Sequence, residues 1–204
     1  MNAQADGRAA AQGERLPFLV SYRVDADGVL LATGGDWNSF AEEAGAPELR
    51  SDLVVGRPLD DFVSGRKTRA VYRALRERIT DTGRPITFPY RCDAPDVRRW
   101  MMMEMRPLPG GVTLFRTWPT AVEPRGSVQV HGRKKSDGRK VLMCGWCKRV
   151  ALGSAWYEIE DALAREPLLD HGVSLRVSHG ICSRCTEHLD LLTRGSSPEA
   201  PPPG

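Results

Sequence analysis

The sequence lacks the features that would place it in a membrane. No apolar run approaches the ~18 residues that a membrane-spanning helix requires. The first residues, MNAQADGRAAAQGERL, contain no apolar segment of the kind that a secretory signal carries. We therefore expect a cytoplasmic protein that makes no membrane contact.

Motifs of several enzyme and cofactor classes are also missing. The sequence contains no kinase ATP-binding motif, no phosphoacceptor-histidine helix, no nucleotide-cyclase signature and no P-loop. Its first histidine is His131, so nothing before that residue can ligate haem through an imidazole. We expect no enzyme, but a regulator that works by binding.

Neither sign of charge dominates, because 29 Lys and Arg face 26 Asp and Glu for a net charge of +3. This balance alone says little about nucleic acid. The length of 204 residues allows one good core, or one core and a small satellite.

Composition divides the chain. Both ends are polar and rich in small residues or proline, and PTAVEPRGSVQVHGRKKSDGRK has no sustained apolar period. We therefore predict a disordered N-terminus over 1–16, a first domain over 17–118, a basic linker over 119–140, a cysteine-containing module over 141–192 and a disordered tail over 193–204.

The first domain has the pattern of an α+β fold. Two β-rich runs, PFLVSYRV and VLLATGG, flank the turn DADG, and three more follow a helical region: ITFPYRCDA, RRWMMMEMRPLP and GVTLFRTWP. Between them we expect a short helix that Asp36 caps and Trp37 anchors against the sheet. An amphipathic helix is predicted over 66–82, where Gly83 ends it.

This order of elements resembles the PAS fold, a five-stranded antiparallel sheet that cups a few helices. The resemblance is carried by YRVDADGVLLATGG, DWNSFAEEAG and above all VVGRPLDDFV. It implies a sensory or protein-binding domain of bacterial signalling, possible homodimerisation, and an interior that holds a ligand in some relatives. The cysteine motif of flavin-binding relatives is absent, and the domain contains no histidine that could ligate haem. We therefore expect neither flavin nor haem.

Strand parity predicts which side chains enter this interior. Phe88, Tyr90 and Cys92 share one face of their strand, and Met101, Met103 and Met105 share one face of theirs. Two interpretations remain open: an adaptable methionine-rich core with an inert thiol, or a pocket for a small apolar ligand.

Cysteine is scarce, with five residues, yet four of them form two CxxC pairs. Cys144 and Cys147 form the first pair, and Cys182 and Cys185 the second. Each pair sets two thiolates a tetrahedral edge apart, so that two pairs complete a structural Zn²⁺ shell with no open position for catalysis. His179 is an alternative fourth ligand, or a residue that orients a thiolate.

The alternatives are a redox CxxC and unrelated thiols. A redox pair needs a helix start beside a thioredoxin-type strand, which is missing around Cys144, and unrelated thiols do not explain the matched spacing. Lys148, Arg149 and Arg184 stand beside the cysteines, where we expect them to offset the negative charge of the thiolates.

The segment CGWCKRV, the later Trp156 and SHGICSRC together resemble a short terminal segment of bacterial two-component and PAS-containing signalling proteins. Ser183 and Arg184 depart from that pattern, in which proline is frequent beside the second pair. The resemblance implies a signalling context with protein partners.

We therefore expect a bacterial regulator that joins a PAS-like domain to a zinc module, without specific nucleic-acid binding. One rival is a zinc-dependent transcriptional regulator that uses the basic run of Arg133, Lys134, Lys135, Arg139 and Lys140. The other is a thiol-based redox sensor.

Overall fold

The computed structural model describes residues 19–94, 96–125, 140–165 and 176–194. The predicted disorder of 1–16, most of the predicted linker and the end of the tail lie outside these residues. Within the described part, no helix is long and apolar enough to cross a membrane.

The first part of the chain is a PAS-like α+β domain. All neighbouring strands of its five-stranded sheet pair antiparallel, in the order β2-β1-β5-β4-β3. The strands are β1 (Val20–Val24), β2 (Leu30–Gly35), β3 (Ile86–Arg91), β4 (Val97–Leu108) and β5 (Val112–Pro124). The order places β2 and β3 at the two edges of the sheet.

The helices of this domain lie between β2 and β3 in sequence. They are α1 (Trp37–Glu43), α2 (Ser51–Val54) and α3 (Arg66–Thr82), with short 3₁₀ turns η1 (Pro47–Leu49), η2 (Leu59–Asp61) and, between β4 and β5, η3 (Pro109–Gly111). The predicted bounds of the long helix are confirmed, because α3 ends at Gly83 in the left-handed conformation with φ of 65°.

The face of the sheet toward α3 forms the core. Met101, Met103 and Met105 are 1%, 3% and 0% exposed, as parity predicted. Leu75 and Ile79 of α3 are fully buried and belong to the same apolar cluster as Met103 and Met105. The apolar residues that recur every four positions on α3 thus pack against the apolar residues at alternate positions of β4.

The cysteine-containing part adds a second, four-stranded sheet. Its strands are ordered β8-β7-β6-β9, and β6 and β9 run parallel. The elements are β6 (Lys140–Cys144), β7 (Val150–Leu152), β8 (Ala155–Tyr157), α4 (Ile159–Arg165), β9 (Arg176–Gly180) and α5 (Ser183–Arg194). The parallel pair brings the two CxxC segments to the same end of the sheet.

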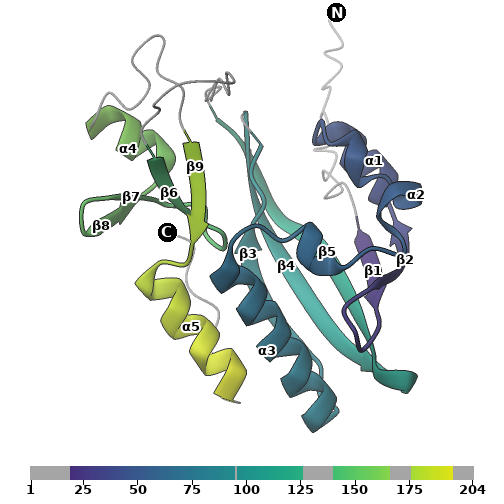
Figure 1. The fold of residues 1–204 in the computed structure, drawn as a ribbon. Helices are drawn as coiled ribbons and strands as arrows, with labels where there is room; N and C mark the ends of the chain where they lie inside the picture. Colours follow the sequence, from purple (N-terminus) through teal and green to yellow (C-terminus); the bar gives the residue numbers. More distant parts are fainter. Residues whose placement is uncertain (1–18, 95, 126–139, 166–175, 195–204) are drawn as a thin grey trace, which may run out of the picture.

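The two parts pack directly against each other. Figure 1 shows α5 beside α3, where the Arg78 side chain of α3 donates to the backbone oxygen of Leu192. One apolar cluster contains Phe88 and Met103 of the PAS-like sheet together with Leu189 and Leu192 of α5. The cysteine-containing module therefore shares a core with the PAS-like domain.

The predicted role of Asp36 is wrong in one respect. Its side chain makes no capping bond to α1 and instead accepts the backbone N–H of Leu19 at 3.1 Å, next to β1. The Leu19 N–H lies at the end of the sheet, where it needs a hydrogen-bond acceptor, and the Asp36 carboxylate supplies it.

Trp37 anchors α1, which leads to a stability prediction. Its ring meets Tyr22 edge-on at 5.6 Å, and its Nε1–H donates to the Leu49 oxygen at 2.7 Å. Trp37→Ala should lower the free energy of unfolding by about 3 kcal/mol, the low end of the range for such truncations because the ring is half-buried. Denaturant unfolding measures the change, and Leu53→Ala, which truncates an exposed side chain of α2, is a control expected to stay within about 0.5 kcal/mol.

Candidate metal centre

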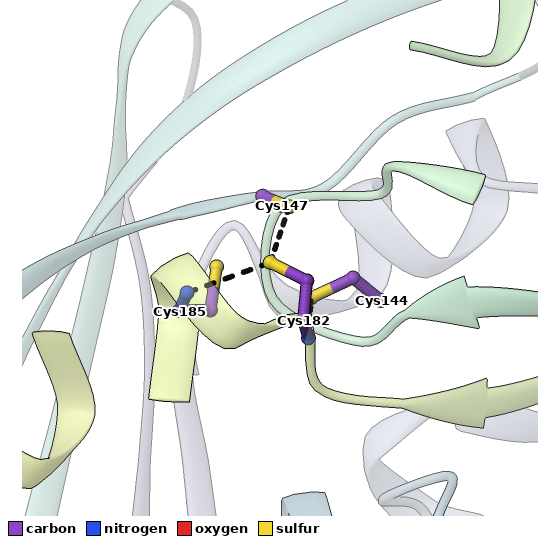
Figure 2. Close-up of side chains that lie close together, drawn as sticks. All are labelled: Cys144, Cys147, Cys182 and Cys185. Carbon is purple, nitrogen blue, oxygen red and sulfur yellow. Dashed lines mark hydrogen bonds between the residues drawn. The ribbon is translucent and has the colours of Figure 1, made fainter. Parts of the chain in front are cut away.

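The four predicted cysteines converge on one point. Their sulfur atoms all lie within 4.8 Å of one another, although 34 residues separate the two pairs. Figure 2 shows the side chains pointing toward a common centre. Cys144, Cys182 and Cys185 are buried and Cys147 is half-buried.

The distances suit a tetrahedral metal. The Sγ atoms of Cys147 and Cys182 are 3.7 Å apart, and a Zn–S bond of about 2.3 Å implies a tetrahedral edge of about 3.8 Å. No other group of metal-ligating side chains of this kind occurs in the described part of the chain. The four cysteines could therefore hold a metal ion.

The turns around the cysteines point N–H groups at the sulfurs. The backbone N–H of Cys182 donates to the Cys144 sulfur, and that of Cys185 to the Cys182 sulfur, both at 3.4 Å. Cys182 and Cys185 lie at the start of α5, where the helix dipole favours negative charge. Both effects stabilise thiolates, the form in which cysteine binds metal.

Without a cation the four thiols cannot all ionise in this volume. Hydrogen bonds from Cys147, Cys182 and Cys185 lower the pKa of Cys144, whereas the hydrogen bond to Cys144 raises the pKa of Cys147 and of Cys185. A thiolate in this cluster is therefore held by hydrogen bonds from thiols that stay protonated, so the four groups do not all ionise together. A divalent ion removes that conflict.

The basic residues beside the cysteines have specific partners. The Lys148 ammonium donates to the Gly145 oxygen at 3.0 Å, and Arg149 donates to Glu158 at 3.1 Å. Arg184 is exposed on α5. Lys148 has a positive φ of 62° within the first turn, a conformation that costs energy for a residue with a side chain.

His179 does not belong to the group of four sulfurs. It lies on β9, half-buried, and its backbone oxygen and Cβ stand against Gly65 at the start of α3. Burial lowers its pKa, with a smaller contribution from Lys148, so the neutral imidazole is favoured at neutral pH.

The pocket candidates lie in two adjoining clusters. Phe88, Met103 and Met105 belong to the main core, while Cys92 and Tyr90 pack beside Met101. The Tyr90 hydroxyl lies 2.7 Å from the Thr117 hydroxyl, which donates to the Met102 oxygen. These residues fill the interior with their own contacts, and the small-ligand pocket remains a prediction.

Sequence reasoning missed Trp146, which lies between Cys144 and Cys147. It is 4% exposed, its ring lies 4.9 Å from that of Phe88, and its Nε1–H donates to the Pro89 oxygen at 2.9 Å. A large aromatic residue inside a CxxC turn was the available signal, since such a side chain is seldom left in water.

Comparison with known proteins places the chain only loosely. No protein-family model matches it. An uncharacterized 104.1 kDa protein in the hypE 3' region of Rhodobacter capsulatus is 34% identical over 96 residues, 43% of this chain. The chain spans 10% of the length of that relative.

Two solved structures are similar to about half of the chain. A domain of an HTR-like protein from Haloarcula marismortui has a TM-score of 0.38 at 13% identity, over 50% of this chain and 98% of that one. The photoactive yellow protein domain of the sensor histidine kinase Ppr from Rhodospirillum centenum has a TM-score of 0.38 at 14% identity, over 48% and 89%. These likenesses are too slight to carry weight, and the PAS-like assignment rests on the order and pairing of the strands.

The ligand set predicts a clear mutational contrast. Cys144→Ser should abolish binding of one Zn²⁺ per chain and unfold the cysteine-containing module, because binding free energy at such a site is folding free energy. His179→Ala should keep the metal. Native mass spectrometry measures both, and loss of zinc from His179→Ala with retention in Cys182→Ser would contradict the assignment.

Cys92 should react slowly with thiol reagents. Burial raises its pKa, against smaller lowering effects of Lys148 and Arg99, so its thiolate fraction at neutral pH is below that of a free cysteine. The labelling rate should rise about tenfold per pH unit until the raised pKa is passed. Thr87→Cys in a Cys92→Ser background gives an exposed control on β3, the strand that ends just before Cys92. Labelling of Cys92 as fast as that control would refute its placement in the interior.

Proposed function

We propose that this chain is a cytoplasmic regulator of bacterial signalling, in which a PAS-like domain binds protein partners and a structural Zn²⁺ site stabilises the fold. The observation that carries the proposal is the position of the four cysteines: their sulfur atoms lie within 4.8 Å of one another, where they could hold one metal ion, inside a core shared with the PAS-like sheet. A filled four-thiolate shell leaves no position for substrate or water, which supports a structural role over a catalytic one.

A docking role is supported by the sheet face opposite α3. Strand alternation places Met102, Leu114 and Trp118 on that face, all half-buried, with Met102 and Trp118 directly paired across β4 and β5. Leu31 on β2 is 45% exposed. The ion-paired Glu104, Arg106 and Arg116 share this face and separate Leu114 from the Met102–Trp118 pair. The apolar contact is therefore centred on Met102 and Trp118, and a second copy of this chain is the partner we expect there.

Native mass spectrometry of the full chain with metal analysis tests the proposal. We expect one zinc per chain and a dimer that Trp118→Glu converts to a monomer without loss of zinc. Leu191→Glu, which changes an exposed leucine on α5, is the matched control and should leave the dimer intact. A chain that binds no metal, or a wild-type protein that stays monomeric at high concentration, would contradict the respective half of the proposal.

Nucleic-acid binding separates this proposal from its first rival. The cations of the predicted basic run, of which only Lys140, at the start of β6, lies within the described residues, should give only weak affinity that falls steeply with salt. Titration of the full chain with duplex DNA and with single-stranded RNA at two salt concentrations measures this. Sequence-selective binding that survives physiological salt would favour the transcriptional regulator instead.

A further inference from the structure

The CGWC turn, residues 144–147, is pressed against the first turn of α3. A Cβ atom on Gly145 would lie only 2.8 Å from the Thr68 hydroxyl oxygen, closer than real Cβ contacts. The Gly145 N–H also donates to the Gly180 oxygen at 2.8 Å, which ties the turn to the end of β9. Even a methyl group at position 145 would force the Thr68 side chain to shift, so the turn and α3 are in close contact.

The same turn closes the free edge of the PAS-like sheet. β3 is the last strand of the sheet, so the Pro89 carbonyl and the Arg91 N–H on its outer side have no partner strand. Trp146 supplies both partners: its Nε1–H donates to Pro89, and its backbone oxygen accepts the Arg91 N–H at 2.9 Å. One residue of the metal-binding turn thus takes the place of a neighbouring strand.

The Trp146 ring extends this contact into the interior. Besides Phe88, it lies 6.0 Å from the Tyr72 ring of α3, and the Tyr72 ring lies 6.2 Å from that of Phe115 on β5. The aromatic contacts therefore run without interruption from the CGWC turn to the middle of the sheet. Displacing Trp146 would leave the Phe88 and Tyr72 rings without their contact on that side.

An ion-pair network forms a second connection. The Arg91 side chain, 8% exposed, pairs with Asp93 and with Glu158 just before α4, and Glu158 also accepts from Arg149. Arg149 follows Cys147 by two residues. Its backbone oxygen accepts a hydrogen bond from the N–H of Cys144 at 2.8 Å. Arg91 is thus held to the metal-binding turn by both its backbone and its side chain.

A bound metal would fix this turn from both ends. Gly145 and Trp146 are the two residues between Cys144 and Cys147, and the turn also holds Lys148 at its unfavourable positive φ. Such a conformation persists only when surrounding contacts enforce it. Two metal–sulfur bonds would supply that enforcement at the residues that flank Trp146.

From these contacts we infer a conformational device: metal occupancy of the four cysteines controls the covering of the β3 edge, and Trp146 transmits it to the PAS-like sheet. This inference rests on the proposed metal role. With metal bound, Trp146 seals the edge; without it, the turn loosens and the outer groups of Pro89 and Arg91 become available to a competing strand. Because coupling is reciprocal, a change at Trp146 also weakens metal binding.

Hydrogen exchange of the full chain tests the device directly. Removing Zn²⁺ from the wild-type protein with a chelator should speed exchange of the Arg91 amide at least tenfold, while amides of Tyr22 and Arg23 in the β1–β5 pair stay unchanged. Trp146→Phe, which keeps a ring but removes the indole N–H, should raise Arg91 exchange with zinc still bound and weaken zinc affinity by a few-fold. Trp37→Phe, which likewise keeps a ring but removes an indole N–H bonded to a backbone oxygen, that of Leu49, is the matched control and should alter neither quantity.

The outcomes separate the two proposals. If wild-type protein binds one zinc but chelation leaves Arg91 exchange unchanged, the device is refuted, while the zinc stoichiometry shows that the binding site itself stands. If Trp146→Phe leaves Arg91 exchange at the wild-type value, Trp146 is not the transmitting residue and the device is likewise refuted. If the wild-type chain binds no zinc, the metal role and the device fail together.

Discussion

Four sulfur atoms that share a sphere of a few ångströms impose the main constraint on this molecule. Thiolates at such separations repel one another strongly in a partly buried site, and neutral thiols make only weak hydrogen bonds. The arrangement is stable when a cation sits among the sulfurs, and it then joins two segments that are far apart in sequence. The parallel pairing of β6 with β9, the direction of α5 and the position of Trp146 all follow from bringing those segments together.

The shared core changes how the two parts of the chain are understood. A tethered zinc module would bury its own small core and leave the PAS-like sheet with an open β3 edge. Here Leu189 and Leu192 of α5 lie in the same cluster as Leu75 and Ile79 of α3. The apolar faces of two amphipathic helices thus belong to one cluster, and neither part keeps its full burial when separated from the other.

The sequence was sufficient for features that depend on local pattern. The four-residue apolar spacing and Gly83 predicted α3, strand parity predicted the buried methionines, and paired CxxC spacing predicted which sulfurs meet. It was insufficient where the partner is distant: Trp146 bonds Pro89 across 57 residues, and Arg91 meets Glu158 across 67. The predicted capping bond of Asp36 was wrong for a related reason, since its carboxylate accepts a hydrogen bond from the backbone N–H of Leu19, 17 residues away. Pro89 within a strand was a usable sign of an edge, but not of what covers it.

The position of Trp146 in the chain has a consequence for synthesis on the ribosome. All five strands of the PAS-like sheet are made before Cys144, and the second cysteine pair follows the first by 34 residues. At a synthesis rate of about 5–20 residues per second, about 2–7 s pass between completion of the first cysteine pair and synthesis of the second. During that interval β3 is exposed to other nascent chains. Pro89, which offers no N–H on the outer side of that strand, makes the bare edge a poor template for pairing until the C-terminal segment arrives.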